Sequence, residues 1–266
     1  MSYSIEGKTA IVTGAANGVG LAIARHFADK GANVMFADMD ENRLAKECGQ
    51  ETDGGNMCYF AGDLREKLTL NNLLSATLDQ FDRVDILING ARQMMPTDPL
   101  DLEDDTMETL IGQNLMPAYR LSQIVARRMM KQSNGDSDRQ AGAIINLSSI
   151  ASRRTQKQIL SYSVSCAALD QMTRSMAVAL APERIRVNGV GFGSVMSASL
   201  KDKLKDHPNY RKEIEANTPL GRIAAPGALA EAVQFLASEG AGFMTGQILT
   251  VDGGRTLIDP VVAPAH

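Results

Sequence analysis

Cysteine is scarce in this sequence, and the spacing of the three cysteines argues against the common uses of that residue. Cys48, Cys58 and Cys166 form no CxxC pair and have no histidine cluster beside them. We therefore expect neither disulfides nor a structural zinc site, and a reducing cytoplasm fits this usage best. Residues 1–8 carry no charged-then-apolar signal region, and no apolar run reaches the ~20 residues that span a bilayer.

An excess of positive charge is also lacking. The chain of 266 residues has a formal net charge of -4 and an isoelectric point near 5.5. Its longest basic pairs, Arg127-Arg128 and Arg153-Arg154, are too short to follow a phosphate backbone. We expect no nucleic-acid partner and no membrane partner, but a small-molecule substrate. With 44% hydrophobic and 22% charged residues, the chain can build an ordinary globular core.

Short apolar runs alternate with helical patterns along the whole chain. Seven of these runs predict buried strands, at residues 9–12, 33–37, 57–60, 84–88, 143–147, 185–190 and 248–252. Strands that are apolar on both faces and separated by helices indicate a parallel sheet covered on both sides. No composition break or internal repeat divides the chain, so we predict one doubly wound α/β domain over residues 1–266. Residues 196–217 lack strand character and are expected to form a mobile helical flap over the substrate.

A glycine-rich turn, Thr13–Gly20, connects the first predicted strand to a helix over Val19–Asp29, and Gly31 follows that helix. A GxxxGxG sequence alone is weak support for a ligand. Here a buried strand precedes it and a helix follows it, which is the context that dinucleotide binding requires. The glycines permit close backbone approach, and the helix N-terminus favours the pyrophosphate. The alternative is a glycine turn that holds no ligand.

Asp38 stands at the end of the second predicted strand. It follows the glycine turn at the ~20-residue separation expected for an acidic residue that binds the nucleotide ribose. A carboxylate there accepts hydrogen bonds from the hydroxyls and repels a 2′-phosphate. The turn itself contains no arginine that would counter this preference. The sequence thus favours NAD over NADP, and the alternative interpretation of Asp38 is a turn residue at a strand end.

Several motifs, in the same order along the chain, are similar to those of the short-chain dehydrogenase/reductase family. They are the turn Thr13–Gly20, Asp63-Leu64, Asn89-Gly90-Ala91, Asn114, Ser149, Tyr162 and the stretch Thr245–Gly254. The similarity extends from about Gly7 to Gly254. It implies a Rossmann-like fold with a seven-stranded parallel sheet, assembly as a homotetramer or homodimer, and hydride transfer between NAD(H) and a carbonyl or secondary alcohol.

The resemblance also implies catalytic roles for three residues. Ser149 would polarise the substrate oxygen, Tyr162 would be its proton donor or acceptor, and Asn114 would hold a water in a proton relay. Other interpretations exist for each residue taken alone. Ser148 and Ser149 are also suitable as strand-end caps, and Tyr162 as a buried aromatic residue whose hydroxyl has a hydrogen-bond partner.

The cofactor site implied by the resemblance draws on most of the strand ends. Asp63 and Leu64 would lie against the adenine ring, and Asn89 beside the cofactor. Val195 and Ser197 match the stretch that hydrogen-bonds the nicotinamide carboxamide. The residues expected at NAD are Gly14, Asn17, Gly18, Val19, Gly20, Asp38, Asp63, Leu64, Asn89, Gly90, Tyr162, Val195 and Ser197.

The chain departs from the family pattern where the tyrosine is followed, four residues later, by lysine, because Cys166 occupies that position. The lysine ammonium ordinarily lowers the tyrosine pKa by its charge. Losing a depression of about three pKa units corresponds to ~4 kcal/mol, or roughly 10³-fold in rate. Arg92, Arg153, Arg154 and Lys157 stand near the expected site in sequence and are the candidate replacement cations.

Two smaller departures accompany Cys166. The family's Asn-Ala-Gly is Asn89-Gly90-Ala91 here, which moves the conformationally permissive residue by one position, and its Pro-Gly is Phe192-Gly193. Three functional classes therefore stay open. They are a working NAD(H)-dependent oxidoreductase, a catalytically impaired NAD-binding pseudoenzyme or regulator, and an enzyme that catalyses elimination or isomerisation without hydride transfer.

Overall fold

The computed structural model describes residues 3–49, 55–133 and 140–259. One seven-stranded sheet has the order β3-β2-β1-β4-β5-β6-β7, and all its pairings are parallel. Its strands are β1 (Thr9–Thr13), β2 (Asn33–Asp38), β3 (Met57–Ala61), β4 (Ile86–Asn89), β5 (Gly142–Ser149), β6 (Ile185–Phe192) and β7 (Ile248–Val251). The predicted sheet is confirmed, and the strand ends differ from the expected ones by no more than two residues.

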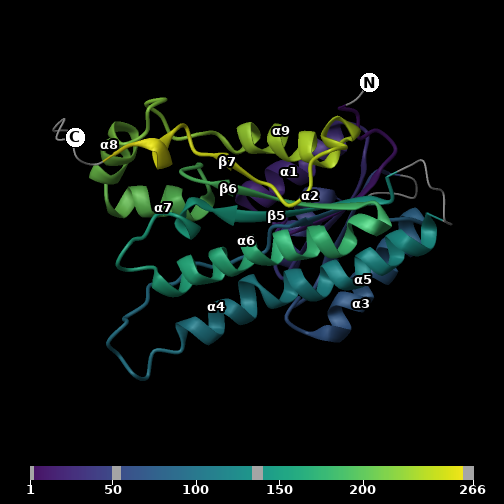
Figure 1. Ribbon diagram of the computed structural model, residues 1–266, viewed down its shortest axis with the longest axis horizontal. Coiled ribbons are helices and arrows are strands. Elements are labelled where there is room, and N and C mark those ends of the chain that lie inside the picture. The colour runs from purple at the N-terminus through teal and green to yellow at the C-terminus, as the bar shows by residue number, and fades with distance from the viewer. Residues whose placement is uncertain (1–2, 50–54, 134–139, 260–266) are drawn as a thin grey trace.

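Helices cover both faces of this sheet (Figure 1). One apolar layer lies under α1 (Gly18–Asp29), α2 (Glu41–Cys48) and α9 (Pro226–Ala237). The other lies under α3 (Lys67–Phe81), α5 (Met116–Gln132) and α6 (Leu160–Leu180), with α4 (Thr106–Asn114) packed against α5 and α6. Helix α1 shows why the pattern folds this way, because Val19, Ile23 and Phe27 recur every four residues and are all buried.

The carboxyl ends of the strands form the edge where a ligand is expected. Strand β1 lies between β2 and β4, so the order of strands reverses there and leaves a crevice beyond their ends. Thr13 joins the two sides of this point: its Oγ1 accepts hydrogen bonds from the backbone amides of Gly90 (2.9 Å) and Ala91 (3.1 Å). The ends of β1 and β4 are thereby held together.

Residues 196–217, expected to be helical, form α7 (Ala198–Asp206) and α8 (Asn209–Ala216). Ser197 begins this segment as the N-cap of α7, where its Oγ accepts a hydrogen bond from the Leu200 amide at 3.2 Å. Figure 1 places both helices beyond the carboxyl end of β5. The segment therefore lies at the ligand-binding edge of the sheet.

Candidate active site

The glycine turn between β1 and α1 depends on close backbone approach. A Cβ on Gly14 would lie 2.8 Å from the carbonyl carbon of Gly90, and a Cβ on Gly20 would lie 2.1 Å from the carbonyl oxygen of Gly14. Gly14 and Gly18 also have positive φ angles, of +72° and +57°. The N-cap residue of α1, Asn17, forms no side-chain capping bond. The first backbone amides of the helix can therefore donate hydrogen bonds to an anionic group. These features fit a dinucleotide pyrophosphate.

Gly90 serves a different purpose from the one its sequence suggests. The glycine is shifted by one position, as the sequence indicates, but Gly90 has no positive φ and so does not use its conformational freedom there. Its requirement is steric: a Cβ would lie 2.6 Å from the Thr13 carbonyl oxygen and 3.0 Å from Leu147 Cδ1. Gly90 thus allows the end of β4 to pack against the end of β1.

Asp38 connects the end of β2 to the glycine turn. Its Oδ2 accepts a hydrogen bond from the Ala16 amide (3.1 Å), and its Oδ1 accepts from the amides of Met39 (2.7 Å) and Asp40 (3.2 Å). Each carboxylate oxygen has two lone pairs, so Oδ2 retains capacity for a ligand hydroxyl. The interpretation of Asp38 as a turn residue is therefore compatible with a role at a ribose.

Asp63 and Leu64 follow β3 at the same edge. Arg65 pairs with the Asp63 carboxylate at 2.5 Å, and this hydrogen-bonded guanidinium holds the pKa of Asp63 below its usual value. Leu64 is buried and packs in the layer beneath α3 and α5. Val195, which lies between β6 and α7, is also buried and forms an isolated β-bridge with Ala224. The adenine and nicotinamide contacts expected of these residues stay predictions.

Ser149 and Tyr162 are brought together although twelve residues separate them in the sequence. Ser149 ends β5, and Tyr162 lies in the first turn of α6 with its side chain buried. The Ser149 hydroxyl lies close enough to that of Tyr162 to favour its phenolate. Ser149 Oγ also accepts a bond from the Ala151 amide at 3.2 Å, so it caps the turn after β5 as well. A hydroxyl pair at the strand ends can hold and protonate a substrate oxygen.

Burial determines how Tyr162 titrates. Removal from water raises the pKa of Tyr162 above its ordinary value near 10, because it disfavours the phenolate. The charge of Arg92 and the hydroxyl of Ser149 oppose this rise in pKa, whereas Cys166 adds to it. The net effect is a phenol that stays neutral at physiological pH.

Cys166 lies one helical turn after Tyr162, and its thiol is close enough to disfavour the phenolate. Its side chain is 4% exposed, and burial raises the pKa of the thiol. Ser148 Oγ lies 3.5 Å from the Cys166 carbonyl oxygen. Cys166 is therefore a neutral, packed thiol, unsuited to act as a cation or as an activated nucleophile.

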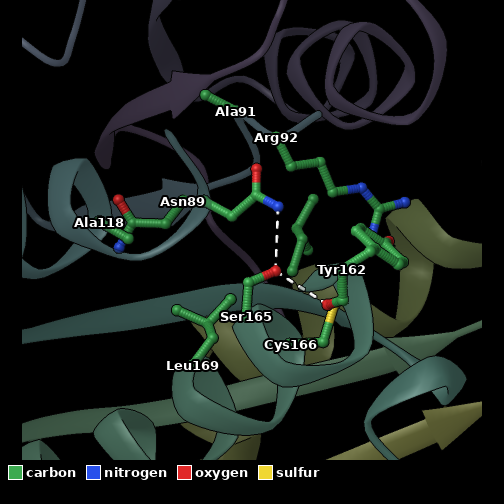
Figure 2. Close-up of a pocket in the computed structure, with 10 residues that line it drawn as sticks. Asn89, Ala91, Arg92, Ala118, Tyr162, Ser165, Cys166 and Leu169 are labelled. Carbon is green, nitrogen blue, oxygen red and sulfur yellow. Dashed lines mark hydrogen bonds between the residues drawn. The ribbon is translucent and has the colours of Figure 1, made fainter. Parts of the chain in front are cut away.

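Arg92, in the segment after β4, is the candidate replacement cation that lines the Tyr162 cavity. Its guanidinium carbon lies 4.2 Å from the centre of the Phe192 ring, and its Nη1 donates to the Ser148 carbonyl at 3.0 Å. Figure 2 shows Arg92, Tyr162 and Cys166 along the wall of this cavity. All four candidate cations are exposed, but Arg153, Arg154 and Lys157 do not line this cavity, and Arg154 donates to the Thr256 carbonyl.

Asn114, the last residue of α4, is buried at the same cavity. Its Oδ1 accepts from the Gln93 amide at 2.8 Å, and its Nδ2 donates to the Gln93 carbonyl and to Ser165 Oγ, at 2.9 and 3.1 Å. The side chain therefore fixes the segment after β4 to α6. The proton relay expected of Asn114 stays a prediction.

Asn89, the last residue of β4, belongs to a buried network of hydrogen-bonded polar side chains. Its Nδ2 donates to Ser122 Oγ (3.0 Å) and Asn146 Oδ1 (2.8 Å), and Asn146 in turn donates to Thr173 Oγ1 at 2.8 Å. Asn89 Oδ1 is buried without a partner among the described residues. An unpartnered acceptor at a cavity suits a ligand that donates a hydrogen bond.

Sequence analysis did not identify the contacts of Thr13, Asn146, Ser165 and Phe192. Asn146 carried a weak indication, as a polar residue inside an apolar strand. The contact between Arg92 and Phe192 joins segments one hundred residues apart, and no local pattern predicts it.

Two kinds of feature are absent from the described parts of the chain. Residues 3–49, 55–133 and 140–259 include no group of three or more side chains able to hold a metal ion. Within those same ranges, every helix is too short or too polar to cross a bilayer.

Comparison with known proteins adds independent findings. A family profile described as enoyl-(acyl carrier protein) reductase matches residues 14–256. L-Rhamnose 1-dehydrogenase (NAD(P)(+)) of Sphingomonas sp. strain SKA58 is 33% identical over 252 residues, which cover 94% of this chain and 96% of that enzyme.

Solved structures agree with these relatives. A 7α-hydroxysteroid dehydrogenase complexed with NADH and 7-oxo glycochenodeoxycholic acid is 31% identical, with a TM-score of 0.87 over 95% of this chain and 96% of that chain. A short-chain type dehydrogenase/reductase from Mycobacterium marinum is 27% identical, with a TM-score of 0.83 over 97% of this chain and 98% of the other. The likeness thus extends over nearly the whole fold.

Proposed function

The chain belongs to the short-chain dehydrogenase/reductase family of nicotinamide-dependent oxidoreductases, and from this premise we propose that it is an NAD(H)-dependent enzyme acting on a secondary alcohol or ketone. The observation that carries the proposal is the pairing of Ser149 with Tyr162 in a fold whose glycine turn suits a dinucleotide. The relatives are named for a sugar and a steroid, so the family likeness selects no particular substrate.

The cofactor side of the proposal rests on residues whose geometry suits a dinucleotide. Gly14, Gly18 and Gly20 would receive the pyrophosphate at the start of α1, and Asp38 would accept hydrogen bonds from the ribose hydroxyls. Its charge would repel a 2′-phosphate, which favours NAD over NADP. When bound, the nicotinamide would supply or accept the hydride.

On the substrate side, Ser149 would donate a hydrogen bond to the substrate oxygen and orient it. Tyr162 would give its proton to that oxygen during reduction and take the alcohol proton during oxidation. Its burial, which keeps the phenol neutral, suits the reductive direction. Residues 196–217 would close over the substrate as a flap, and the chain would act as one binding and catalytic unit.

Cys166 is the reason for a second, weaker candidate. We take it to stand at the family's lysine position, and a neutral thiol beside Tyr162 would not stabilise the phenolate. The chain would then bind NAD(H) but turn over slowly. An elimination or isomerisation gains no support from relatives that are named dehydrogenases and reductases.

One experiment tests the function and separates the two candidates. Thermal stabilisation by NADH and NADPH would be measured together with turnover of a panel of ketones and secondary alcohols, for wild type and Cys166→Lys, with Cys166→Ala as the control without charge. We expect greater stabilisation by NADH, measurable wild-type turnover, and a gain in kcat/KM in Cys166→Lys that reaches roughly 10³-fold only if no other cation acts on Tyr162.

The outcomes discriminate as follows. Stabilisation by NADH without wild-type turnover, restored in Cys166→Lys, would favour the impaired candidate. Stabilisation by neither dinucleotide would contradict both. Stronger stabilisation by NADPH would contradict the role of Asp38 alone.

Location and assembly complete the proposal. The cytoplasm suits a chain in which Cys166 is a buried free thiol. A homodimer or homotetramer would bury apolar side chains that are exposed on the helices covering the sheet, such as Val164 and Val178 on α6. Light scattering at working concentration would give a single-chain mass if this assembly is wrong.

A further inference from the structure

We propose that Arg92 is the positioning cation of this site, supplying from the segment after β4 the positive charge that acts on the Tyr162 hydroxyl. The inference rests on the proposed function, which gives Tyr162 its proton-transfer role. Cys166 carries no positive charge, so the proposal gives this electrostatic role to Arg92, a residue outside the helix of Tyr162.

Two contacts hold the Arg92 guanidinium in place. It lies over the Phe192 ring at 4.2 Å and donates to the Ser148 carbonyl at 3.0 Å. Phe192 is the register partner of Ser149 across β5 and β6, and Ser148 precedes Ser149 in β5. Both anchors of Arg92 therefore flank Ser149, whose hydroxyl acts on Tyr162.

Neither anchor neutralises the guanidinium. An aromatic face and a backbone carbonyl carry only partial negative charge. Across the described residues, the carboxylate ion pairs involve other arginines and lysines, and none includes Arg92. Water screens the exposed part of the Arg92 side chain, but no paired carboxylate cancels the charge that its guanidinium presents to the cavity.

The other groups named here that face Tyr162 or its neighbour Cys166 are neutral or acidic. Ser149 contributes a neutral hydroxyl from β5, and Cys166 a neutral thiol from α6. Asp170, one turn further along α6, is an acid whose charge acts on Cys166 in the opposite direction. The positive charge of Arg92 acts on both Tyr162 and Cys166, where it opposes the rise in pKa that burial causes.

The proposal links two departures from the family pattern, Cys166 and Phe192, to the position of Arg92. A short thiol at Cys166 leaves the cavity wall without a long cationic side chain, and Arg92 enters the same cavity from the other side. The aromatic ring of Phe192 provides a surface on which a planar guanidinium stacks, which proline would not provide. Arginine also keeps its charge at any pH at which the enzyme works.

The test removes and restores this charge. Arg92→Met removes it with little change in length, Arg92→Lys keeps it, and Arg153→Met is the matched control for an exposed arginine near the site. Tyrosine ionisation would be followed by ultraviolet absorbance in cofactor-free protein, with Tyr162→Phe subtracted in each background. Turnover would be measured for a neutral and a carboxylated substrate, and the variants would be repeated in Cys166→Lys.

We expect Arg92→Met to raise the pKa of Tyr162 and to lower kcat/KM about 10- to 100-fold. Arg92→Lys should recover most of this loss, and Arg153→Met should change kcat/KM less than about twofold. In Cys166→Lys the loss caused by Arg92→Met should shrink severalfold, because the two cations share one task.

Three results would overturn the proposal. They are unchanged tyrosine ionisation in Arg92→Met, an equal loss in both backgrounds, or a rise in KM confined to the carboxylated substrate. The second would indicate a structural role through Phe192, and the third a role in substrate binding. If no substrate is turned over, the proposed function fails, but the tyrosine titration of the cofactor-free protein still decides the role of Arg92.

Discussion

The two sides of the strand-end crevice are built in different ways. On the side of β1 and α1, the turn is shaped by backbone atoms at close range, as with Gly20 against the Gly14 carbonyl. On the side of β5 and α6, the site is made of side chains that come from four different segments, with Arg92, Ser149, Tyr162 and Phe192 as its main members. Binding thus depends on local backbone geometry, whereas proton transfer depends on long-range placement.

This difference implies that binding and chemistry can be altered separately. A glycine in a tight turn tolerates no side chain, so its substitution acts on the nucleotide and on folding. A hydroxyl at the other side can be removed with little change in shape. A substitution on one side of the crevice, or at the connection between the sides, therefore tests whether the other side changes with it.

The largest effect is expected from Tyr162→Phe. Removing the hydroxyl removes the proposed proton donor, so kcat/KM should fall by roughly 10³-fold or more. The NADH dissociation constant, measured by fluorescence titration, should change less than about threefold, because the turn is untouched. Tyr119→Phe is the matched control, since Tyr119 is partly exposed on α5 and its hydroxyl accepts a bond from Gln123. Substantial residual turnover would remove Tyr162 from the mechanism.

Next in size is Gly20→Ala, the corresponding change on the binding side. Its Cβ would meet the Gly14 carbonyl oxygen at 2.1 Å, so the turn must move. We expect about 100-fold weaker NADH binding and a loss of stability of about 1–3 kcal/mol. In Gly227→Ala, the control within helix α9, the added Cβ has open space, and stability should stay equal or rise slightly. Unchanged NADH affinity in Gly20→Ala would show that the nucleotide lies elsewhere.

These two sides also differ in how far the sequence predicts them. The strands, α1 and the glycine turn follow from periodicity and from glycine spacing, which are local properties. The close approach of Gly90 to Thr13 does not, because it involves two strands more than seventy residues apart.

The catalytic side shows the same limit more strongly. Ser149, Tyr162 and Cys166 could be identified by resemblance, and their spacing placed them on one strand end and one helix. The position of Arg92 could not be predicted among four candidate cations, because it depends on an aromatic ring that β6 brings to the site. Burial of the phenol is also a property of the packed fold and raises the pKa of Tyr162.

The pH dependence of turnover measures that burial directly. Alcohol oxidation requires the ionised phenol and carbonyl reduction the neutral one, and the pKa of Tyr162 lies above its ordinary value. Between about pH 6 and 9, kcat/KM for oxidation should therefore rise about tenfold per pH unit, while kcat/KM for reduction stays nearly constant. A plateau of the oxidation rate below about pH 8 would indicate that a charge from the binding side, rather than burial, sets the titration of the phenol.

The smallest effect is expected at Thr13, whose hydroxyl connects the two sides. Thr13→Val preserves the shape but removes the acceptor for the amides of Gly90 and Ala91, at a cost of about 1–3 kcal/mol. Thr13→Ser keeps the acceptor and is the control. Because β4 leads into the segment that carries Arg92, a shift of its end should weaken NADH binding and lower kcat/KM together, each by a factor of about two to five. A loss confined to one of the two measurements would mean that the sides are independent even where Thr13 joins them.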